Sequence, residues 1–148
     1  MMRPATSHDV AAIEAIVQAA YSPYIARIGR KPGPMLEDYP QLVQAGGVHV
    51  LENAGQVQGF IILLPTDGAI LLDNLAVAPE AQGLGFGRLL MDFAEQQALD
   101  AGFAAIRLYT NEAMTENITL YTRRGYVETH RAEAHGLRRV YMTKHLQE

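Results

Sequence analysis

The sequence predicts an α+β fold with a mixed β-sheet of six or seven strands. Strand-like and helix-like segments follow one another in mixed order, and strand-like segments occur at both ends. The chain has 148 residues, of which 49% are hydrophobic, which is enough for one compact domain with a buried core. No repeat, low-complexity tract or linker divides it, so residues 1–148 are expected to form a single domain.

The chain is expected to begin with a short strand and an amphipathic helix. Residues 1–4 fit the strand, and Thr6 or Ser7 can cap a helix over residues 9–20. Apolar residues recur in this helix at the spacing of one buried face. They are Val10, Ile13, Ile16 and Val17.

An irregular segment and a hairpin are predicted next. Prolines and glycines interrupt residues 21–39, and a short helix is expected over residues 35–44. Residues 48–52 and 57–64 are rich in β-branched and apolar side chains around Asn53-Ala-Gly55, a pattern typical of a β-hairpin.

Strands and helices alternate in the rest of the chain. The longest helical pattern covers residues 84–101 and ends at Gly102. Its apolar positions are Leu89, Leu90, Phe93, Ala94 and Leu99. The other elements expected are strands over residues 70–77, 105–110, 126–129 and 138–144, and a helix over residues 115–124 capped by Thr115.

Charge and cysteine content exclude several classes of function. A net charge of -4 without a basic block gives no support to nucleic-acid binding. The absence of cysteine excludes disulfides, thiolate metal sites and a covalent cysteine intermediate, and the five histidines lack metal-ligand spacing. No signal peptide or membrane-spanning run is present, so a soluble cytoplasmic protein with no membrane partner is expected.

A glycine-rich loop between a strand and a helix is the most informative feature. Gln82 precedes three alternating glycines, Gly83, Gly85 and Gly87, directly before the long helical pattern. Glycines allow several main-chain amides to converge, and the helix start adds its free amides and positive dipole end. The loop therefore predicts a phosphate or pyrophosphate site, with a simple helix-starting turn as the alternative. A P-loop is excluded because no Lys-Ser/Thr follows, and the late position in the chain disfavours a Rossmann fold.

Two motifs together resemble those of the GNAT acetyltransferase superfamily. Gln82-Gly-Leu-Gly-Phe-Gly87 matches the Gln/Arg-x-x-Gly-x-Gly/Ala signature, and residues 117–126 resemble the helix that carries Leu-Tyr before Gly and an aromatic. The resemblance covers essentially the whole chain. It implies a GNAT-like sheet flanked by about four helices, splayed fourth and fifth strands, acetyl-CoA as acyl donor, and no metal.

The resemblance also implies where acetyl-CoA binds. The loop amides would take the pyrophosphate, and the strand before the loop would pair with the pantetheine arm through its exposed backbone. Many relatives have an asparagine seven positions before the helix tyrosine, but this position is Met114, so Asn111 or Asn117 is expected to replace it. The expected cofactor-binding residues are Leu75, Ala76, Val77, Gln82, Gly83, Leu84, Gly85, Phe86, Gly87, Arg88, Asn111 and Asn117.

The same resemblance implies a general acid, whereas the base is less defined. Tyr121 occupies the position where relatives often place the acid for the departing thiolate, although a packing role explains it too. The family's strand glutamate corresponds here to Tyr109. Asp73 is therefore the expected base, directly or through water, because strand alternation gives it the face of Leu75 and Val77. A strand-capping role is the alternative for Asp73.

The acceptor is expected to bind between two irregular segments, residues 21–39 and 133–138. Cations and aromatics in the first segment favour an acceptor with a carboxylate or phosphate beside its amine, unless these cations are simply solvated. Glu37 and Asp38 would instead attract a polyamine or a lysine side chain. The residues expected to contact the acceptor are Tyr21, Tyr24 and Arg27.

The leading hypothesis is an N-acetyltransferase that moves the acetyl group from acetyl-CoA to a primary amine on a small molecule or peptide. Because no cysteine can carry the acetyl group, transfer would be direct, in a ternary complex. The alternative is a non-catalytic acyl-CoA-binding module, and a nucleotide-binding domain is a third class. A homodimer through the last strands fits the fold, although no feature of the sequence requires it.

Overall fold

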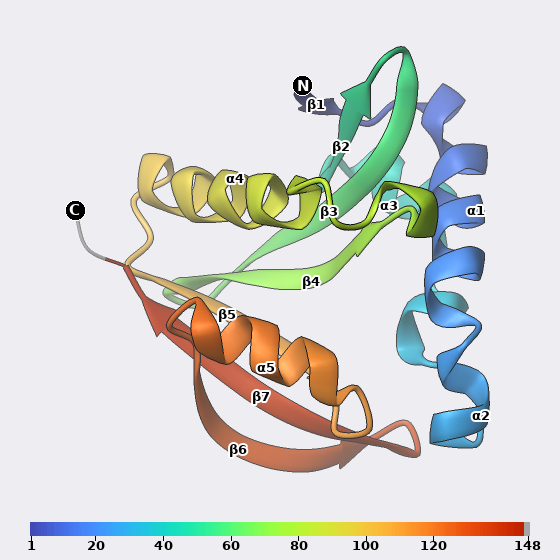
Figure 1. Ribbon diagram of the computed structural model, residues 1–148. Helices are drawn as coiled ribbons and strands as arrows, with labels where there is room; N and C mark the ends of the chain where they lie inside the picture. Colours follow the sequence, from blue (N-terminus) through green and yellow to red (C-terminus); the bar gives the residue numbers. More distant parts are fainter. Residues whose placement is uncertain (147–148) are drawn as a thin grey trace.

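The computed structural model describes residues 1–146. They form one seven-stranded sheet in the order β1-β2-β3-β4-β5-β7-β6, in which β4 and β5 run parallel and every other neighbouring pair is antiparallel. In Figure 1, β1 near the top and β6 near the bottom are the two outer strands. The predicted α+β class and mixed sheet are confirmed.

The strands are β1 (Met2–Pro4), β2 (Val48–Asn53), β3 (Gln56–Thr66), β4 (Ala69–Val77), β5 (Ala105–Asn111), β6 (Val127–Ala134) and β7 (Leu137–His145). The α-helices within residues 1–146 are α1 (Val10–Tyr21), α2 (Tyr24–Ile28), α3 (Tyr39–Ala45), α4 (Phe86–Asp100) and α5 (Thr115–Arg123). Short 3₁₀ turns cover Ser7–Asp9, Gly33–Leu36 and Pro79–Ala81. None of the helices in this described part is both long and apolar enough to cross a membrane.

The sheet carries a hydrophobic core on each face. Strand β3 shows why, because its apolar run has no polar face: Phe60 and Ile62 pack with α1 and α3, whereas Ile61 and Leu63 pack with α4 and α5. The sequence pattern of α1 is largely confirmed, since Ile13, Ile16 and Val17 are buried and Val10 is half-buried.

Strands β4 and β5 separate after a short paired stretch. Only Ile70–Leu72 of β4 pair with Ile106–Leu108 of β5, whereas the later residues of β4 pair with β3 alone. Figure 1 shows the two strands diverging between α4 and α5 toward α1. The splay implied by the family resemblance is confirmed, and it leaves one backbone edge of β4 free of a partner strand.

A β-bulge lies where the strands part. In the β3–β4 ladder Ile62 faces Asn74 and Leu63 faces Leu72, so Asp73 is the extra residue. The bulge shifts the side-chain alternation: Leu72 faces α4 before it, and Leu75 and Val77 do so after it. The bulged residue, Asp73, therefore lies directly after the stretch of β4 that pairs with β5.

Several predicted boundaries are corrected in the first half of the chain. Residues 21–39 are not wholly irregular, because α2 forms there and stops at Gly29, whose φ is +88°. The helix expected over residues 35–44 begins only at Tyr39, because the Asp38 carboxylate accepts a hydrogen bond from the Gln41 amide at 3.2 Å and caps it.

Further predicted boundaries and caps are corrected in the second half of the chain. Helix α4 begins at Phe86 rather than at residue 84, because Gly85 has a φ of +85° and stands outside the helix. Its Leu89 is 51% exposed, whereas Met91 and Ala98 are buried, because α4 turns this neighbouring stripe toward the sheet. Helix α5 is preceded by Met114 as its N-cap residue rather than capped by Thr115. Strand β6 extends to Ala134, beyond the predicted end at residue 129.

Candidate active site

A cavity of about 540 Å³ lies where β4 and β5 separate. Strands β4, β5 and β7, together with helices α1 and α5, contribute side chains to its wall, and residues 32–37 cover it. Six of the polar side chains that line the cavity bear on the chemistry that the site can perform. They are Glu37, Asp73, Tyr109, Asn117, Tyr121 and Arg139.

The glycine loop leads directly from the splayed end of β4 into α4. Gly83 and Gly85 have φ values of +86° and +85°, which only glycine adopts without strain. Gly85 is also the N-cap residue of α4, so no side chain caps the first turn of that helix. A Cβ built on Gly83, Gly85 or Gly87 would meet no protein atom within 4 Å, so space for an anion remains beside the free amides.

Two carbonyl groups near the splay are already engaged. The Leu75 carbonyl oxygen accepts a hydrogen bond from the Tyr21 hydroxyl at 3.0 Å. The Val77 carbonyl oxygen accepts one from the Gln82 side-chain amide at 3.3 Å, which holds the start of the loop against β4. Ala76 points into the core on the other face and is buried.

Both candidate asparagines line the cavity. Asn111 accepts a hydrogen bond from the Ala113 amide at 2.9 Å and so shapes the turn between β5 and α5. Asn117 lies in the first turn of α5. Met114 is 4% exposed and packs in the core with α1, and its sulfur accepts a hydrogen bond from the Thr110 hydroxyl at 3.9 Å.

Tyr121 combines a packing role with a place in the cavity wall. Its ring is 7% exposed and its centroid lies 5.9 Å from that of Tyr126. Burial raises the pKa of the Tyr121 phenol to about 12. The phenol therefore stays protonated at neutral pH and keeps a proton to donate.

Asp73 points into the cavity from the β4 bulge. Its Oδ1 accepts a hydrogen bond from the Tyr109 hydroxyl at 3.2 Å, whereas its buried Oδ2 has no donor within the described residues. Burial first, and the charge of Asp73 second, raise the pKa of Tyr109 to about 12. The Arg139 guanidinium stacks 4.0 Å above the Tyr109 ring.

Glu37 stands beside Asp73, and sequence reasoning did not identify it as a candidate base. Burial is the main cause that raises the pKa of Glu37 to about 8, and the close contact with the Asp73 carboxylate adds to it. Its partner in the sequence prediction, Asp38, caps α3 instead of facing the cavity.

A buried hydrogen-bond chain fixes the wall near these carboxyls. The Tyr21 hydroxyl donates to Asn74 Oδ1 at 2.8 Å, and Asn74 Nδ2 donates to the Tyr39 hydroxyl at 2.9 Å. The Tyr39 hydroxyl in turn donates to the Pro34 carbonyl. The chain links α1, β4, α3 and the 3₁₀ turn before Glu37. Polar residues inside apolar segments, such as Asn74, were its only sequence signal.

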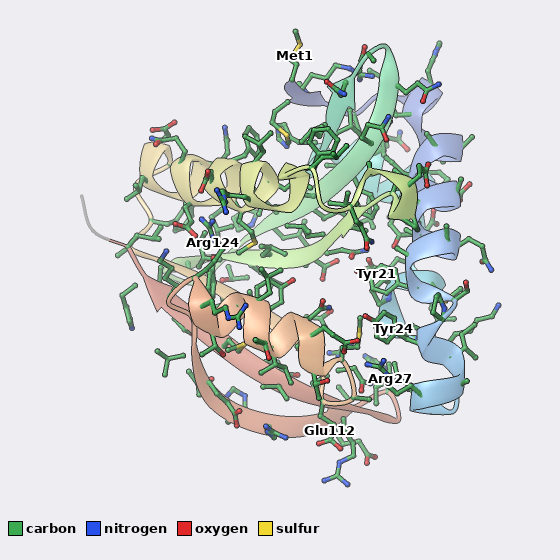
Figure 2. The ribbon with its side chains drawn as sticks, in the orientation of Figure 1. Met1, Tyr21, Tyr24, Arg27, Glu112 and Arg124 are labelled. Carbon is green, nitrogen blue, oxygen red and sulfur yellow. The ribbon has the colours of Figure 1, made fainter. Side chains whose placement is uncertain are left out.

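Tyr24 and Arg27 do not belong to the lining of the cavity, unlike Tyr21. The Arg27 guanidinium lies 4.9 Å from the Tyr24 ring centroid, pairs with Glu116 at 2.6 Å and donates to the Ala113 carbonyl at 3.2 Å. Figure 2 shows both side chains extending from α2 toward the start of α5. They join these two helices.

Comparison with known families identifies the fold. The model of the acetyltransferase (GNAT) domain matches residues 44–128, which include the splayed strand, the glycine loop and Tyr121. The chain belongs to the GNAT acetyltransferase family. A transferase of acetyl groups is therefore the general class of this protein.

The relatives are distant. Mycothiol acetyltransferase of Jonesia denitrificans is 32% identical over 83 residues, which are 55% of this chain and 26% of that protein. The match thus spans about a quarter of the curated relative. The ribosomal-protein-S18-alanine N-acetyltransferase of Escherichia coli is 18% identical, with 100% of this chain and 94% of that chain covered and a TM-score of 0.79. PaiA N-acetyltransferase of Thermoplasma acidophilum, solved with coenzyme A, is 16% identical, with coverage of 99% and 98% and a TM-score of 0.80. At such identities the structures show the shared fold.

Proposed function

We propose that this GNAT protein transfers the acetyl group of acetyl-CoA directly to a primary amine in a ternary complex. The observation that carries the proposal is the cavity at the splay, which combines a phenol, Tyr121, with a carboxylate, Asp73. The family supports acetyl transfer in general. The names of the relatives, one acting on an alanine of a ribosomal protein, are consistent with an amine acceptor.

The residues around the splay fit acetyl-CoA. The free amides of residues 83–88 at the start of α4 suit the pyrophosphate, and the open space at the three glycines lets it approach the main chain. The unpaired edge of β4 over residues 75–77 suits the amides of the pantetheine arm, with Asn111 and Asn117 across the cavity. The Leu75 carbonyl already accepts from Tyr21, so the arm would share this oxygen.

The proposed chemistry needs a neutral amine, a polarised thioester carbonyl and a proton for the thiolate. In this proposal Asp73 takes the proton of the incoming ammonium. The amine then attacks the thioester carbon, and as the carbon–sulfur bond breaks Tyr121 gives its proton to coenzyme A and regains one from the nitrogen, which becomes the amide. Tyr21 lines the cavity, so we assign the acceptor contact to it; Tyr24 and Arg27 act only by holding α2 against α5.

An assay of coenzyme A release across a panel of primary amines tests this function. The wild-type protein is expected to bind coenzyme A and to release it from acetyl-CoA with at least one amine. Binding without turnover on any amine would favour a non-catalytic acyl-CoA-binding module. Absence of affinity for coenzyme A in calorimetry would overturn both.

A further inference from the structure

Two carboxyl groups meet in the cavity without a donor for their buried oxygens. Glu37 Oε2 and Asp73 Oδ2 are both buried, and neither accepts a hydrogen bond from any residue in 1–146. Both side chains line the same cavity, and the neighbouring Asp73 carboxyl contributes, after burial, to the raised pKa of Glu37. Two ionised carboxylates in this position repel, whereas a single proton between them satisfies both oxygens at once.

The one lysine or arginine in the cavity lining of the described residues can balance a single negative charge on the Glu37–Asp73 pair. This residue is Arg139, and its guanidinium stacks on the Tyr109 ring. It therefore offsets a pair that carries one proton better than a pair that carries none. The other titratable groups near Glu37, from α1, α3, β5 and the turn after β6, are Glu14, Tyr21, Tyr39, Tyr109 and His135.

One buried network positions both carboxyls. Asn74, next to Asp73 on β4, donates to Tyr39, whose hydroxyl donates to the carbonyl of Pro34, three residues before Glu37. Tyr109 fixes the other oxygen of Asp73. The contact between segments 36 residues apart in the sequence is thus built into the fold, not a chance meeting of exposed side chains.

We propose that Glu37 and Asp73 act together as the base of the reaction, and that the acceptor enters the cavity as an alkylammonium ion whose proton they take and share. This inference rests on the proposed acetyl transfer and names both its base and its class of acceptor. Once the pair has lost its shared proton, its two negative charges exceed the single positive charge of Arg139 and recruit a cationic amine. The unprotonated pair is the active base, and it removes the proton that makes the amine unreactive.

The step balances in protons and electrons. The pair first loses its shared proton to water, and then an N–H bond of the ammonium breaks as an O–H bond forms on Glu37, shared with Asp73. The freed lone pair attacks the thioester carbon, and the carbon–sulfur bond then breaks. The thiolate takes a proton from Tyr121, which regains one from the nitrogen, and the pair ends with one shared proton, as it began. The products are the amide, the thiol of coenzyme A and one proton.

Burial and the pairing of the two carboxyl groups bring the pKa of Glu37 closer to that of an alkylammonium ion. Burial and the contact with Asp73 raise the pKa of Glu37 from its ordinary 4.5 to about 8. An alkylammonium has a pKa of about 10, as in lysine. Proton transfer is then unfavourable by a factor of about 10², compared with about 10⁶ for an ordinary glutamate, since each pKa unit is tenfold.

A direct titration tests the pair without any acceptor. Protein labelled with ¹³C at the glutamate carboxyl carbons is titrated from pH 5 to 10 by NMR, as wild type, as Glu37→Gln and as Asp73→Asn. One carboxyl signal is expected to titrate near pH 8, to be absent from Glu37→Gln, and to titrate at least one unit lower in Asp73→Asn. A folded wild-type protein in which every glutamate titrates below pH 6 would overturn the shared proton.

Kinetics test the role in transfer. With an alkylamine acceptor from the panel, Glu37→Gln is expected to lower kcat/KM about 10²-fold and to remove the rise in kcat/KM near pH 8. With hydroxylamine, which is already neutral at pH 7, the loss is expected to stay below about tenfold. Glu128→Gln on β6, outside the cavity lining, is the matched control and should behave as wild type.

The outcomes separate this inference from the proposed function. Equal losses with both nucleophiles would show that Glu37 only supports the structure, and would refute its role as a base. An unaltered Kd for coenzyme A in Glu37→Gln is expected, because the residue lies on the acceptor side. Failure of every protein, wild type included, to bind coenzyme A would refute the acetyltransferase itself, whatever the titration shows.

Discussion

Replacing Gly85 with alanine is expected to weaken coenzyme A binding far more than it destabilises the protein. Gly85 precedes α4 with a φ of +85°, and an added Cβ meets no protein atom within 4 Å. In the free protein the alanine therefore brings backbone strain without a clash. Once a pyrophosphate lies against the loop, the same methyl group occupies the space that the anion needs.

The two effects can be estimated separately. A left-handed alanine costs about 1–2 kcal/mol, which corresponds to a fall in Tm of about 2–8 °C for a domain of this size. Each hydrogen bond from a main-chain amide to a charged oxygen is worth about 1.5–3 kcal/mol. Losing one of them raises the Kd for coenzyme A roughly 10- to 100-fold.

Gly68 provides the matched control. It has a φ of +75° and equally open surroundings, but it lies in the turn before β4, at the opposite end of that strand from the loop. Thermal unfolding and calorimetry with coenzyme A are measured for both alanine variants. The Tm should fall by a similar amount in both variants, whereas only Gly85→Ala should bind coenzyme A more weakly. If Gly85→Ala binds coenzyme A as tightly as Gly68→Ala, the loop does not hold the pyrophosphate.

Three further predictions test the rest of the site and the fold. Tyr121→Phe is expected to lower kcat about 10²-fold with an unchanged Kd for coenzyme A, and a variant with wild-type kcat would refute the acid role. Asn74→Leu removes one hydrogen-bond partner from each of two buried tyrosine hydroxyls, which keep their bonds to main-chain carbonyls. It is expected to lower the free energy of unfolding in urea by about 1–3 kcal/mol, and an unchanged stability would contradict the network. Asp9→Asn weakens the two hydrogen bonds that the Arg3 guanidinium donates to this carboxylate, and it should lower the free energy of unfolding by about 1–3 kcal/mol at pH 7. Because these hydrogen bonds lower the pKa of Asp9 from 3.8 to about 2, its contribution is present above pH 3.8 and is lost as the pH falls toward 2. The difference in the free energy of unfolding between Asp9→Asn and the wild type should therefore become smaller as the pH falls from 3.8 to 2.

The fold was predictable where local pattern and tertiary packing agree. The apolar runs of β3 and β4 and the periodicity of α1 placed these elements within a few residues. The β4 bulge at Asp73 was not predictable, because it arises from pairing with β3 and leaves no turn residue in the sequence. Helix α2 was hidden for a different reason: five residues do not form a stable helix alone, and this one packs Tyr24 and Ile28 against the core.

The geometry of the glycine loop, which is the proposed site of the acyl donor, was predictable from the sequence, whereas the carboxyl pair was not. Main-chain amides bind a pyrophosphate through a local loop, so the alternating glycines carry the signal within a few residues. The acceptor side depends on side chains that meet across the sheet. Nothing near Glu37 in the sequence indicates Asp73 as its neighbour, because the contact is produced by the bulge and by the chain of hydrogen bonds through Tyr39. Sequence reasoning could name the two residues separately but could not pair them.

This difference in origin determines which substitutions can disable each side. A main-chain donor has no side chain to remove, so recognition of the acyl donor fails only when a Cβ or a changed φ blocks the loop. The acceptor side is sensitive to a single atom, because exchanging one carboxyl oxygen of Glu37 for an amide removes the shared proton and keeps the shape. An altered acceptor can therefore arise from changes in residues 32–37 that leave the glycine loop untouched. On this reasoning, exchanging that segment should change the preferred amine while the Kd for coenzyme A stays within about twofold, and a parallel loss of both would show that the two sides are not separable.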